Sequence, residues 1–514
     1  MRIDRLEIRS PWKNLGGLIV DFDQHRDIAV LIGRNGSGKS NLLEAIITIF
    51  RNLNLGEPAA FAYEIRYEIE GRKLVIEAEA GNQPKGQLDD RAVSLSDLRQ
   101  KWTPKYVVSY YSGVSDHFEK LFRRHDQRAL NETLVPTKRG VIPEKLNLRR
   151  FMYVQSVHGL FALLAFYFSD DKEVMTFLKG LPRIEGFDSA LLIVHKPGWA
   201  KNNSNANDFW GATGPVRELL ERILRYSLVP FARTITVKPD FRRREKREVV
   251  YLYLPDLKAL RELANEYGRD PRALFQALDT MRLSDLIEDF RVHVRVRGSA
   301  GPIHTRQLSE GEQQLLTVLG VMRFTRNESS LYILDEPDTH LNPDWGVQYL
   351  SHLRKIGGIH RNSHTLLATH DPLLVAGLCR EEIRVLTRGS DGRIVASTPE
   401  EDPRGTGVAS VLTSPLYGLE SQLDTFSLRV LKRIYDVSLE EKSDKRTRHL
   451  RRLRRLIPSL EAAESSPDPY RNIAQEAYQL ALQRAVSSSQ PTNNKKAVVD
   501  ELATKLYDEA APRK

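Results

Sequence analysis

The chain has 514 residues, which is too many for one ordinary core and enough for roughly two to four domains. Its composition, 41% hydrophobic and 28% charged, includes no apolar run of membrane-spanning length, no signal-peptide core after Met1 and a single cysteine, so we expect a cytoplasmic protein without a membrane partner. The net charge of +10 favours a polyanionic partner, nucleic acid first, although a basic surface kept for solubility explains it equally well.

The N-terminal region, residues 1–112, begins with short strands around a glycine-rich loop. The strands predicted from their apolar residues are 3–8, 17–22, 28–32, 61–80 and 106–111. From Ser40 to Phe50, apolar residues recur at helical spacing. A strand, a glycine-rich loop and a helix in direct succession are the setting that a phosphate-binding loop requires.

This glycine loop, residues 33–40, reads Gly-Arg-Asn-Gly-Ser-Gly-Lys-Ser. Its glycines allow successive backbone N–H groups to turn inward around phosphates, and the following helix adds the positive end of its dipole. Lys39 is expected to contact the β- and γ-phosphates of ATP, and the Ser40 hydroxyl to ligate Mg²⁺. The flanking strand and helix disfavour the alternative of a plain glycine-rich turn. The expected nucleotide contacts here are Gly33, Asn35, Gly36, Ser37, Gly38, Lys39, Ser40 and Asn41.

The middle region, residues 113–289, changes character and is expected to be a mainly helical insertion. Its predicted helices are 150–168, 216–228 and 270–289. Residues 234–238 and 249–254 are expected to form a strand pair around a basic turn. The candidate contacts of this turn with a nucleic-acid backbone or a partner are Arg242, Arg243, Arg244, Lys246 and Arg247.

The next region, residues 290–403, has an acidic pair at the end of an apolar strand. The predicted strands are 290–296, 331–334 and 365–368, with a helix over 315–324. Because an apolar run such as 331–334 belongs in a buried parallel sheet, the carboxylates after it should face the ligand crevice. Asp335 is expected to hold Mg²⁺, and Glu336 to orient the attacking water or accept its proton. An adjacent acidic pair on its own is usually a solvated turn.

A short segment before this helix, residues 308–314, has two interpretations. With Ser309 as the cap and Glu312 three residues later, it is a capping box at a helix start. Ser309 and Gly311 can also offer a hydroxyl and backbone N–H groups to a γ-phosphate. The position of the segment before Asp335, with one predicted helix between them, favours the contact with phosphate.

The C-terminal region, residues 404–514, is expected to be a charged, mainly helical extension that docks a partner or nucleic acid. A basic helix is predicted around residues 445–455, with leucines on its opposite face. Its candidate contact residues are Arg448, Arg451, Arg452 and Arg455. Contact with nucleic acid, docking of a partner and a plain solvated face all explain this pattern.

Together, these separated motifs resemble the Walker A, signature, Walker B and switch-histidine motifs of ABC-type ATPases. The resemblance is carried by residues 33–40, 308–314, 334–337 and 369–370. The sequence around the glycine loop, residues 28–45, is similar to the RecF, SMC and OLD branch rather than to membrane transporters. The implied fold is α/β: an ABC-type P-loop ATPase head with a mixed sheet, a helical insertion and a mainly helical C-terminal extension.

The resemblance implies an ATP hydrolase that needs ATP and Mg²⁺ and dimerises head to head. The residues that would close on the ATP of the other subunit are Ser309, Gly311 and Glu312. Asp338 matches the family's D-loop position at that interface, and His370 would contact the γ-phosphate. One departure concerns the family's glutamine, which completes the coordination of Mg²⁺ and water. Residues 110–113 contain none, and Gln155 has a helical context.

Two stretches narrow the biological role. Residues 110–113 and 411–419 resemble stretches of stand-alone ATPases in bacterial anti-phage systems of the Septu type, which also occur with some retrons. Those ATPases work with a separate HNH nuclease, so the resemblance implies a homo-oligomer that regulates a nuclease subunit. Two alternatives stay open: a DNA-binding repair ATPase similar to RecF and SMC proteins, and a nuclease of the OLD type whose catalytic residues the sequence does not reveal.

Overall fold

The computed structural model describes two compact units, Met1–Gly418 and Leu419–Lys514. The described residues are 1–133, 149–169, 171–180, 182–201, 203–237, 244–326, 328–358, 362–419, 421, 423–438 and 443–457. Arg242 and Arg243, two of the predicted basic contacts, lie outside these ranges. Residues 404–418, which the sequence pattern groups with the C-terminal extension, belong to the first unit.

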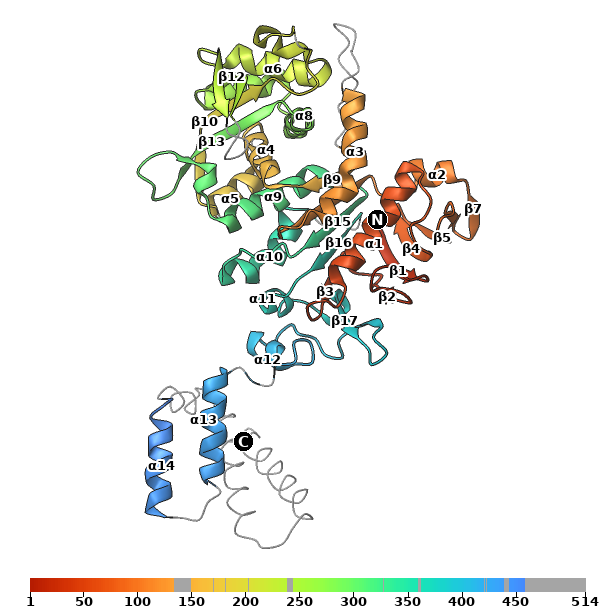
Figure 1. The fold of residues 1–514 in the computed structure, drawn as a ribbon, viewed down its shortest axis with the longest axis vertical. Coiled ribbons are helices and arrows are strands. Elements are labelled where there is room, and N and C mark those ends of the chain that lie inside the picture. Colours follow the sequence, from red (N-terminus) through yellow and green to blue (C-terminus); the bar gives the residue numbers. More distant parts are fainter. Residues whose placement is uncertain are drawn as a thin grey trace, which may run out of the picture. The chain divides into compact units, whose positions relative to one another are not determined.

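A seven-stranded sheet carries the predicted motifs (Figure 1). In spatial order its strands are β18 (Ile394–Ser397), β17 (Ile383–Arg388), β3 (Ile28–Ile32), β16 (Ser363–Ala368), β15 (Ser330–Asp335), β8 (Tyr106–Tyr111) and β9 (Phe151–Val154). All neighbouring strands run parallel except β17 and β18. The strands β3, β15 and β16 are buried along their whole length, as strands of a parallel sheet covered on both faces should be.

Successive side chains of this sheet enter two different hydrophobic cores, because they point to opposite faces of a strand. Ala29 and Leu31 of β3 pack in a core with α1 (Lys39–Leu55) and a second, antiparallel sheet. In order, the strands of that sheet are β2 (Ile19–Asp21), β1 (Arg2–Ile8), β4 (Tyr63–Ile69), β5 (Arg72–Ala78), β6 (Lys85–Leu88) and β7 (Arg91–Val93). The short helix α2 (Leu95–Gln100) packs against β6.

The other face of the seven-stranded sheet is covered by helices, and Val30 and Ile32 point toward it. These helices are α4 (Ser156–Phe166), α9 (Glu310–Thr325), α10 (Pro343–Lys355) and α11 (Pro372–Val375). The helices α4 and α9 approach closely, because a Cβ atom on Gly320 would lie 2.5 Å from the Cβ of Ala162. Small residues at this contact allow α9, the helix that begins in the signature segment, to pack closely against α4.

The insertion contains a five-stranded antiparallel sheet in addition to its helices (Figure 1). The strands in order are β11 (Phe231–Val237), β12 (Glu245–Leu254), β10 (Ile184–His195), β13 (Ile287–Val296) and β14 (Ile303–His304). Its remaining helices are α3 (His117–Thr133), α5 (Lys172–Gly180), η1 (Ala206–Gly211), α6 (Gly214–Tyr226), α7 (Leu257–Glu266) and α8 (Pro271–Leu283). The predicted strand pair around the basic turn is present as β11 and β12. The strand predicted at 290–296 is β13, and it pairs with β10 in this sheet.

Two predicted helices are wrong at one end. The helix predicted over 150–168 begins only at Ser156, because residues 151–154 form β9 beside β8. The helix predicted over 270–289 ends at Leu283, and residues 287–289 begin β13. Both errors concern short apolar stretches, whose periodicity fits a helix or a strand equally well. Pairing with a neighbouring strand is what makes them strands. That partner lies far away in the sequence in both cases.

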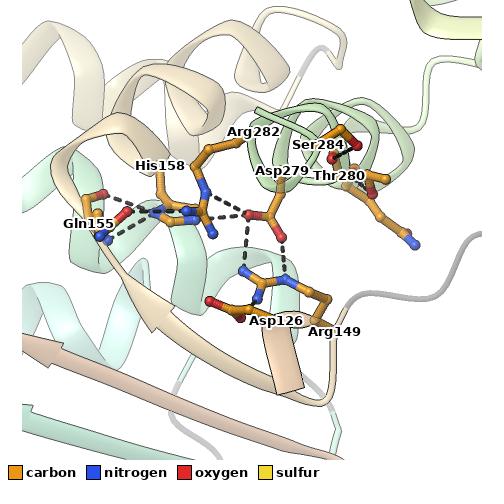
Figure 2. A network of polar contacts seen from close by, with 9 residues as sticks. Asp126, Arg149, Gln155, His158, Asp279, Thr280, Arg282 and Ser284 are labelled. Carbon is orange, nitrogen blue, oxygen red and sulfur yellow. Dashed lines mark hydrogen bonds and ion pairs between the residues drawn. The ribbon is translucent and has the colours of Figure 1, made fainter. Parts of the chain in front are cut away.

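A buried ionic network joins α8 to the start of β9 and to α4 (Figure 2). At its centre, Asp279 of α8 is only 2% exposed. Arg149 donates from Nε and Nη2 to the two carboxylate oxygens, at 2.5 and 3.0 Å. His158 and Arg282 lie at 3.1 and 3.2 Å from the Oδ1 atom of Asp279. Burial alone would raise the pKa of Asp279, but Arg149, His158 and Arg282 hold it well below its usual range.

The C-terminal unit contains two described helices, α13 (Thr425–Ser438) and α14 (Asp444–Arg454), which contact each other. Val437 and Ile457 are buried in this unit.

Two further short elements of the first unit are η3 (Arg380–Glu382) and α12 (Val408–Thr413). Across the residues described in both units, no helix is apolar and long enough to span a membrane.

We expect Asp279→Ala to lower the free energy of unfolding by about 3–5 kcal/mol, because it leaves the buried guanidinium of Arg149 without its main partner. Urea unfolding at neutral pH, followed by circular dichroism, measures this change. Asp208→Ala is the control, because it removes a partner of Arg217 that is 62% exposed and should cost no more than about 1 kcal/mol. Equal losses in the two variants would contradict a stabilising role of the network.

Candidate functional site

The carboxyl ends of four parallel strands meet at one edge of the seven-stranded sheet. Asp335, the last residue of β15, pairs with Ala368 of β16 and with Tyr111 of β8. Ala368 pairs in turn with Leu31 of β3. The glycine loop, the acidic pair and the switch histidine therefore leave the sheet next to one another, at the edge where open α/β sheets bind ligands.

The glycine loop begins with a backbone conformation and a close approach that only glycine allows. Gly33 has φ 149°, and a Cβ atom there would lie 2.3 Å from the carbonyl oxygen of Leu386. Within the described part of the chain, the buried Ser37 hydroxyl has no hydrogen-bond partner. Asn35 and Gly36 are exposed at the tip of the loop. The loop thus presents backbone groups and a free hydroxyl, which suits phosphate oxygens.

Lys39 and His370 meet across this edge. The Lys39 ammonium donates to the carbonyl oxygen of Gly33 at 2.9 Å and lies 2.7 Å from Nε2 of His370. Burial lowers the pKa of His370, and the charge of Lys39 lowers it further, against the opposing effect of Glu336. The imidazole is therefore neutral at pH 7 and accepts at Nε2. Burial also lowers the pKa of Lys39, although Asp335 and Glu336 oppose this.

Ser40 and Asp335 form a pair of oxygen ligands. The hydroxyl of Ser40 lies close enough to the carboxylate of Asp335 to lower its pKa, and the Oδ2 atom of Asp335 is buried without a hydrogen-bond partner among the described residues. Burial, with a smaller contribution from Glu336, raises the pKa of Asp335 to about 6, although Ser40 and Lys39 act against it. Mg²⁺ prefers a few protein oxygens together with water and phosphate. The two side chains fit this ion, and they would hold it as predicted.

Glu336 has an unusual backbone for a residue other than glycine. Its φ is 51°, in the left-handed region, and its N–H donates to the carbonyl oxygen of Ala368 at 2.8 Å. Its carboxylate is partly exposed, and Oε1 lies 3.5 Å from Nε2 of His370. The turn therefore directs a carboxylate into the space beside Lys39 and His370, where a water can reach it.

The signature segment forms the capped start of α9. The side chain of Ser309 accepts from the backbone N–H of Glu312 at 3.3 Å, and the Glu312 carboxylate accepts from the backbone N–H of Ser309 at 2.7 Å. The capping box is therefore present, and the serine and the helix start stay exposed. Gly311 packs against the loop after Asp338, since a Cβ atom there would lie 2.6 Å from the carbonyl oxygen of His340. The signature segment and the D-loop thus lie together in one chain.

Asp338 is buried inside its own chain, with 6% of its surface exposed. The hydroxyl of Thr369 donates to its carboxylate. Burial raises the pKa of Asp338 to about 7, and the neighbouring Asp371 adds to the rise, whereas Thr369 lowers it. In this structure the residue predicted at a subunit interface therefore links the D-loop to the switch-histidine loop of the same chain.

The departure at the family's glutamine persists in the structure. The strand next to β15 is β8, and the residue after it, Ser112, contacts the D-loop residue Thr339 at 3.0 Å between their hydroxyl oxygens. Gln155 lies after β9, one strand further out, and caps the start of α4. Its side-chain oxygen accepts from Arg282 at 3.3 Å. Its amide is thus part of the network in Figure 2.

The predicted basic contacts have different surroundings. Arg244 and Lys246 are exposed, whereas Arg247 lies in β12 and donates to Glu288 at 2.9 Å. The arginines of the C-terminal unit are exposed, on or directly after α14: Arg448, Arg451, Arg452 and Arg455. Among the described residues, the exposed candidate contacts are therefore these four arginines of the C-terminal unit and, beside the hairpin turn, Arg244 and Lys246.

The family match to known proteins includes most of these motifs. Residues 189–376 match the family described as "AAA domain, putative AbiEii toxin, Type IV TA system". The matched residues include the signature segment, the acidic pair and the switch histidine, and they exclude the glycine loop. The structure that carries these motifs is an α/β fold with a mixed seven-stranded sheet, further antiparallel sheets and covering helices. This confirms the predicted fold class.

One curated relative and several solved structures are similar to the chain. Septu protein PtuA from Bacillus mycoides (strain KBAB4) is 26% identical over 119 residues, which span 22% of this chain and only 16% of PtuA. The SMC head domain from Thermotoga maritima is 12% identical, with a TM-score of 0.32 over 78% of this chain and 100% of that one. The recombination mediator protein RecF with ATP is 13% identical, with a TM-score of 0.30 over 77% and 99%. Scores this low carry no argument of their own.

Sequence reasoning missed residues that support the site from outside the motifs. Asn14 donates to the carbonyl oxygen of Gly36 at 3.3 Å and accepts from the side chain of Asn41 at 2.7 Å. It therefore holds both ends of the phosphate-binding turn. No local pattern marks Asn14, because it lies in the turn between β1 and β2 and meets the loop only in the folded chain.

We expect Lys39→Ala to lower the affinity for ATP at least about tenfold, because it removes the buried ammonium that faces the phosphate position. Titration with a fluorescent ATP analogue measures the change. Lys101→Ala is the matched control, because it removes an ammonium that is 66% exposed on the side chain and paired only with Asp97. Unchanged binding in Lys39→Ala would remove this residue from the site.

Proposed function

We propose that this chain is a cytoplasmic, Mg²⁺-dependent ATPase that dimerises head to head around ATP and regulates a separate nuclease in bacterial anti-phage defence. The observation that carries the catalytic part is the convergence of Lys39, Asp335, Glu336 and His370 at one edge of a parallel sheet. A lysine, a metal-binding carboxylate and a partly exposed second carboxylate are the groups that phosphoryl transfer to water requires.

Each residue has one task in this mechanism. The backbone of the glycine loop and Lys39 bind the β- and γ-phosphates, which then separate the ammonium from Nε2 of His370. Ser40 and Asp335 would hold Mg²⁺, which would supply positive charge to offset the charge that develops on the phosphate oxygens. Glu336 orients the water that attacks the γ-phosphorus and accepts its proton. His370, whose Nε2 atom is no longer occupied by the Lys39 ammonium, would donate a ring N–H to the γ-phosphate on the other side.

A second copy of the chain would complete the site. Ser309 and the exposed N-terminus of α9 offer a hydroxyl, backbone N–H groups and the positive end of a helix dipole. Because Gly311 packs against the D-loop of its own chain, the signature segment and the D-loop would move as one surface toward the partner's ATP. This arrangement explains why a helix start that is already capped by Glu312 keeps its serine exposed.

We expect Glu336→Gln to bind ATP normally, to hydrolyse it at least about a hundredfold more slowly and to accumulate as a dimer in ATP. Removing the base leaves the binding residues in place, so the closed state cannot decay by hydrolysis. Phosphate release and light scattering with and without ATP measure the two effects. Glu328→Gln, which changes a carboxylate paired with Lys105, is the control. Hydrolysis at wild-type speed by Glu336→Gln would show that Glu336 is misassigned.

The proposed role in defence rests on likeness in sequence. The likeness to PtuA covers a small part of both chains, and the sequence also resembles Septu-type ATPases at residues 110–113 and 411–419. We infer that the effector is a nuclease subunit of the HNH type, encoded beside this chain, in a Septu or retron system. The exposed arginines of α14 are the surface that we assign to this subunit or to the nucleic acid that it cuts.

The complex with the neighbouring gene product should cut DNA under the control of ATP, whereas the purified chain alone should not. We expect the double reversal Arg448→Glu/Arg452→Glu to weaken capture of that subunit at least about tenfold, because it reverses charge on the proposed surface. Arg72→Glu/Arg297→Glu, at positions 60% and 65% exposed on other elements, is the matched control. Cleavage by the chain alone would contradict the partner hypothesis and favour an OLD-type nuclease.

A further inference from the structure

The segment that ends the first unit folds back beside the switch-histidine loop. Its helix α12 contacts α11, and Val411 is buried in the same core as α10 and α11, with 1% exposure. After α12 the chain turns sharply, and the Gly418 N–H donates to the carbonyl oxygen of Ser414 at 2.8 Å. This turn places the ring of Tyr417 against that core. Neither the nucleotide motifs nor the proposed mechanism uses this segment.

The charges of two carboxylates, Asp371 and Asp338, act on the phenol of Tyr417. Asp371 caps α11 by accepting from the N–H of Leu373 at 2.9 Å, and its Oδ2 atom lies 3.0 Å from the position of a Cβ on Gly346 in α10. The charge of Asp371 also raises the pKa of Asp338. Burial raises the pKa of the Tyr417 phenol, and Asp371 and Asp338 raise it further.

Two hydroxyls at this cluster are buried without a partner. Among the described residues, neither the Tyr417 hydroxyl nor that of Tyr349, one turn beyond Gly346 in α10, makes a hydrogen bond. Asp338 also lies near Tyr349, whose pKa burial raises well above its ordinary value. A buried hydroxyl without a partner is unfavourable and uncommon. Next to carboxylates it indicates a hydrogen bond that forms in another state of the loops.

The same turn also reaches the glycine loop. A Cβ atom on Gly418 would lie 3.5 Å from Nη2 of Arg34, the second residue of that loop. On its other side, the cluster continues through Thr369, which donates to Asp338 and directly precedes His370. Asp338 itself follows Glu336 by two residues. The turn that carries Tyr417 therefore approaches the glycine loop at Arg34, and the carboxylates whose charge acts on its phenol are joined to the switch-histidine loop through Thr369.

We propose that Tyr417 is a positioning residue for ATP hydrolysis: its hydroxyl donates to the carboxylate of Asp338 when the D-loop closes on bound nucleotide, and this bond fixes the turn that carries Glu336. The inference rests on the proposed ATPase function and adds a residue to it. An ionised carboxylate accepts a stronger hydrogen bond than a neutral acceptor, so the loss of this bond should be measurable as a rate at a pH above the pKa of Asp338.

The test uses the full chain with Tyr417→Phe, which keeps the ring and removes only the hydroxyl. We expect kcat to fall about tenfold or more, with KM for ATP within about twofold of wild type and an unchanged melting temperature. Tyr167→Phe is the matched control, because it removes the hydroxyl of a partly buried tyrosine whose ring packs against Phe187 in the insertion. A lower melting temperature of Tyr417→Phe would show that the hydroxyl already has a partner, and would overturn the inference.

A double-mutant cycle distinguishes positioning from a general packing role. If Tyr417 acts through Asp338, adding Tyr417→Phe to Asp338→Asn should slow hydrolysis no further. Losses that multiply would overturn the inference, as would a Tyr417→Phe variant with the kcat of wild type. A wild-type chain that hydrolyses no ATP would overturn the proposed function itself, so the two failures can be told apart.

Discussion

Backbone hydrogen bonds between β3, β16 and β15 determine where the glycine loop, the acidic pair and the switch histidine lie. The register that pairs Leu31 with Ala368, and Ala368 with Asp335, brings three loops from distant parts of the sequence to one edge. A shift of one residue in either pairing would turn each side chain to the opposite face of the sheet. It would move Ala368 out of one core and break the approach of Lys39 to His370. The chemistry therefore depends on a sheet whose strands are buried on both faces.

The parts that could be predicted from the sequence are those with a strong local signal. The strands before the glycine loop and the acidic pair are continuous apolar runs, so β3 and β15 lie where the pattern indicates. The four residues of β9 carry no such signal, because their assignment depends on pairing with β8. The resemblance to ABC-type ATPases implies that Asp338 lies at a subunit interface. Its burial against Thr369 follows from the neighbouring positions of β15 and β16, which no single segment reveals.

Long-range contacts also explain how the insertion is attached to the head. Its sheet is continuous with none of the motif-bearing strands, but α8 reaches the start of β9 and α4 through Asp279. The helix α4 in turn lies against α9 at Gly159 and Gly320, where larger side chains would clash with Thr317 and Ala162. A movement of α9 at its signature end would therefore be transmitted to the insertion through close packing and buried charge, both of which resist gradual deformation.

The left-handed backbone of Glu336 has a consequence for stability. A residue with a side chain in this region costs about 1 kcal/mol or more compared with glycine, which adopts it freely. Glycine would therefore relax the turn, but it would also remove the carboxylate beside His370. The chain thus accepts a less favourable conformation at the residue to which we assign the activation of water, which would be a local trade-off between robustness and activity. Selection for thermal stability alone would favour replacing the glutamate.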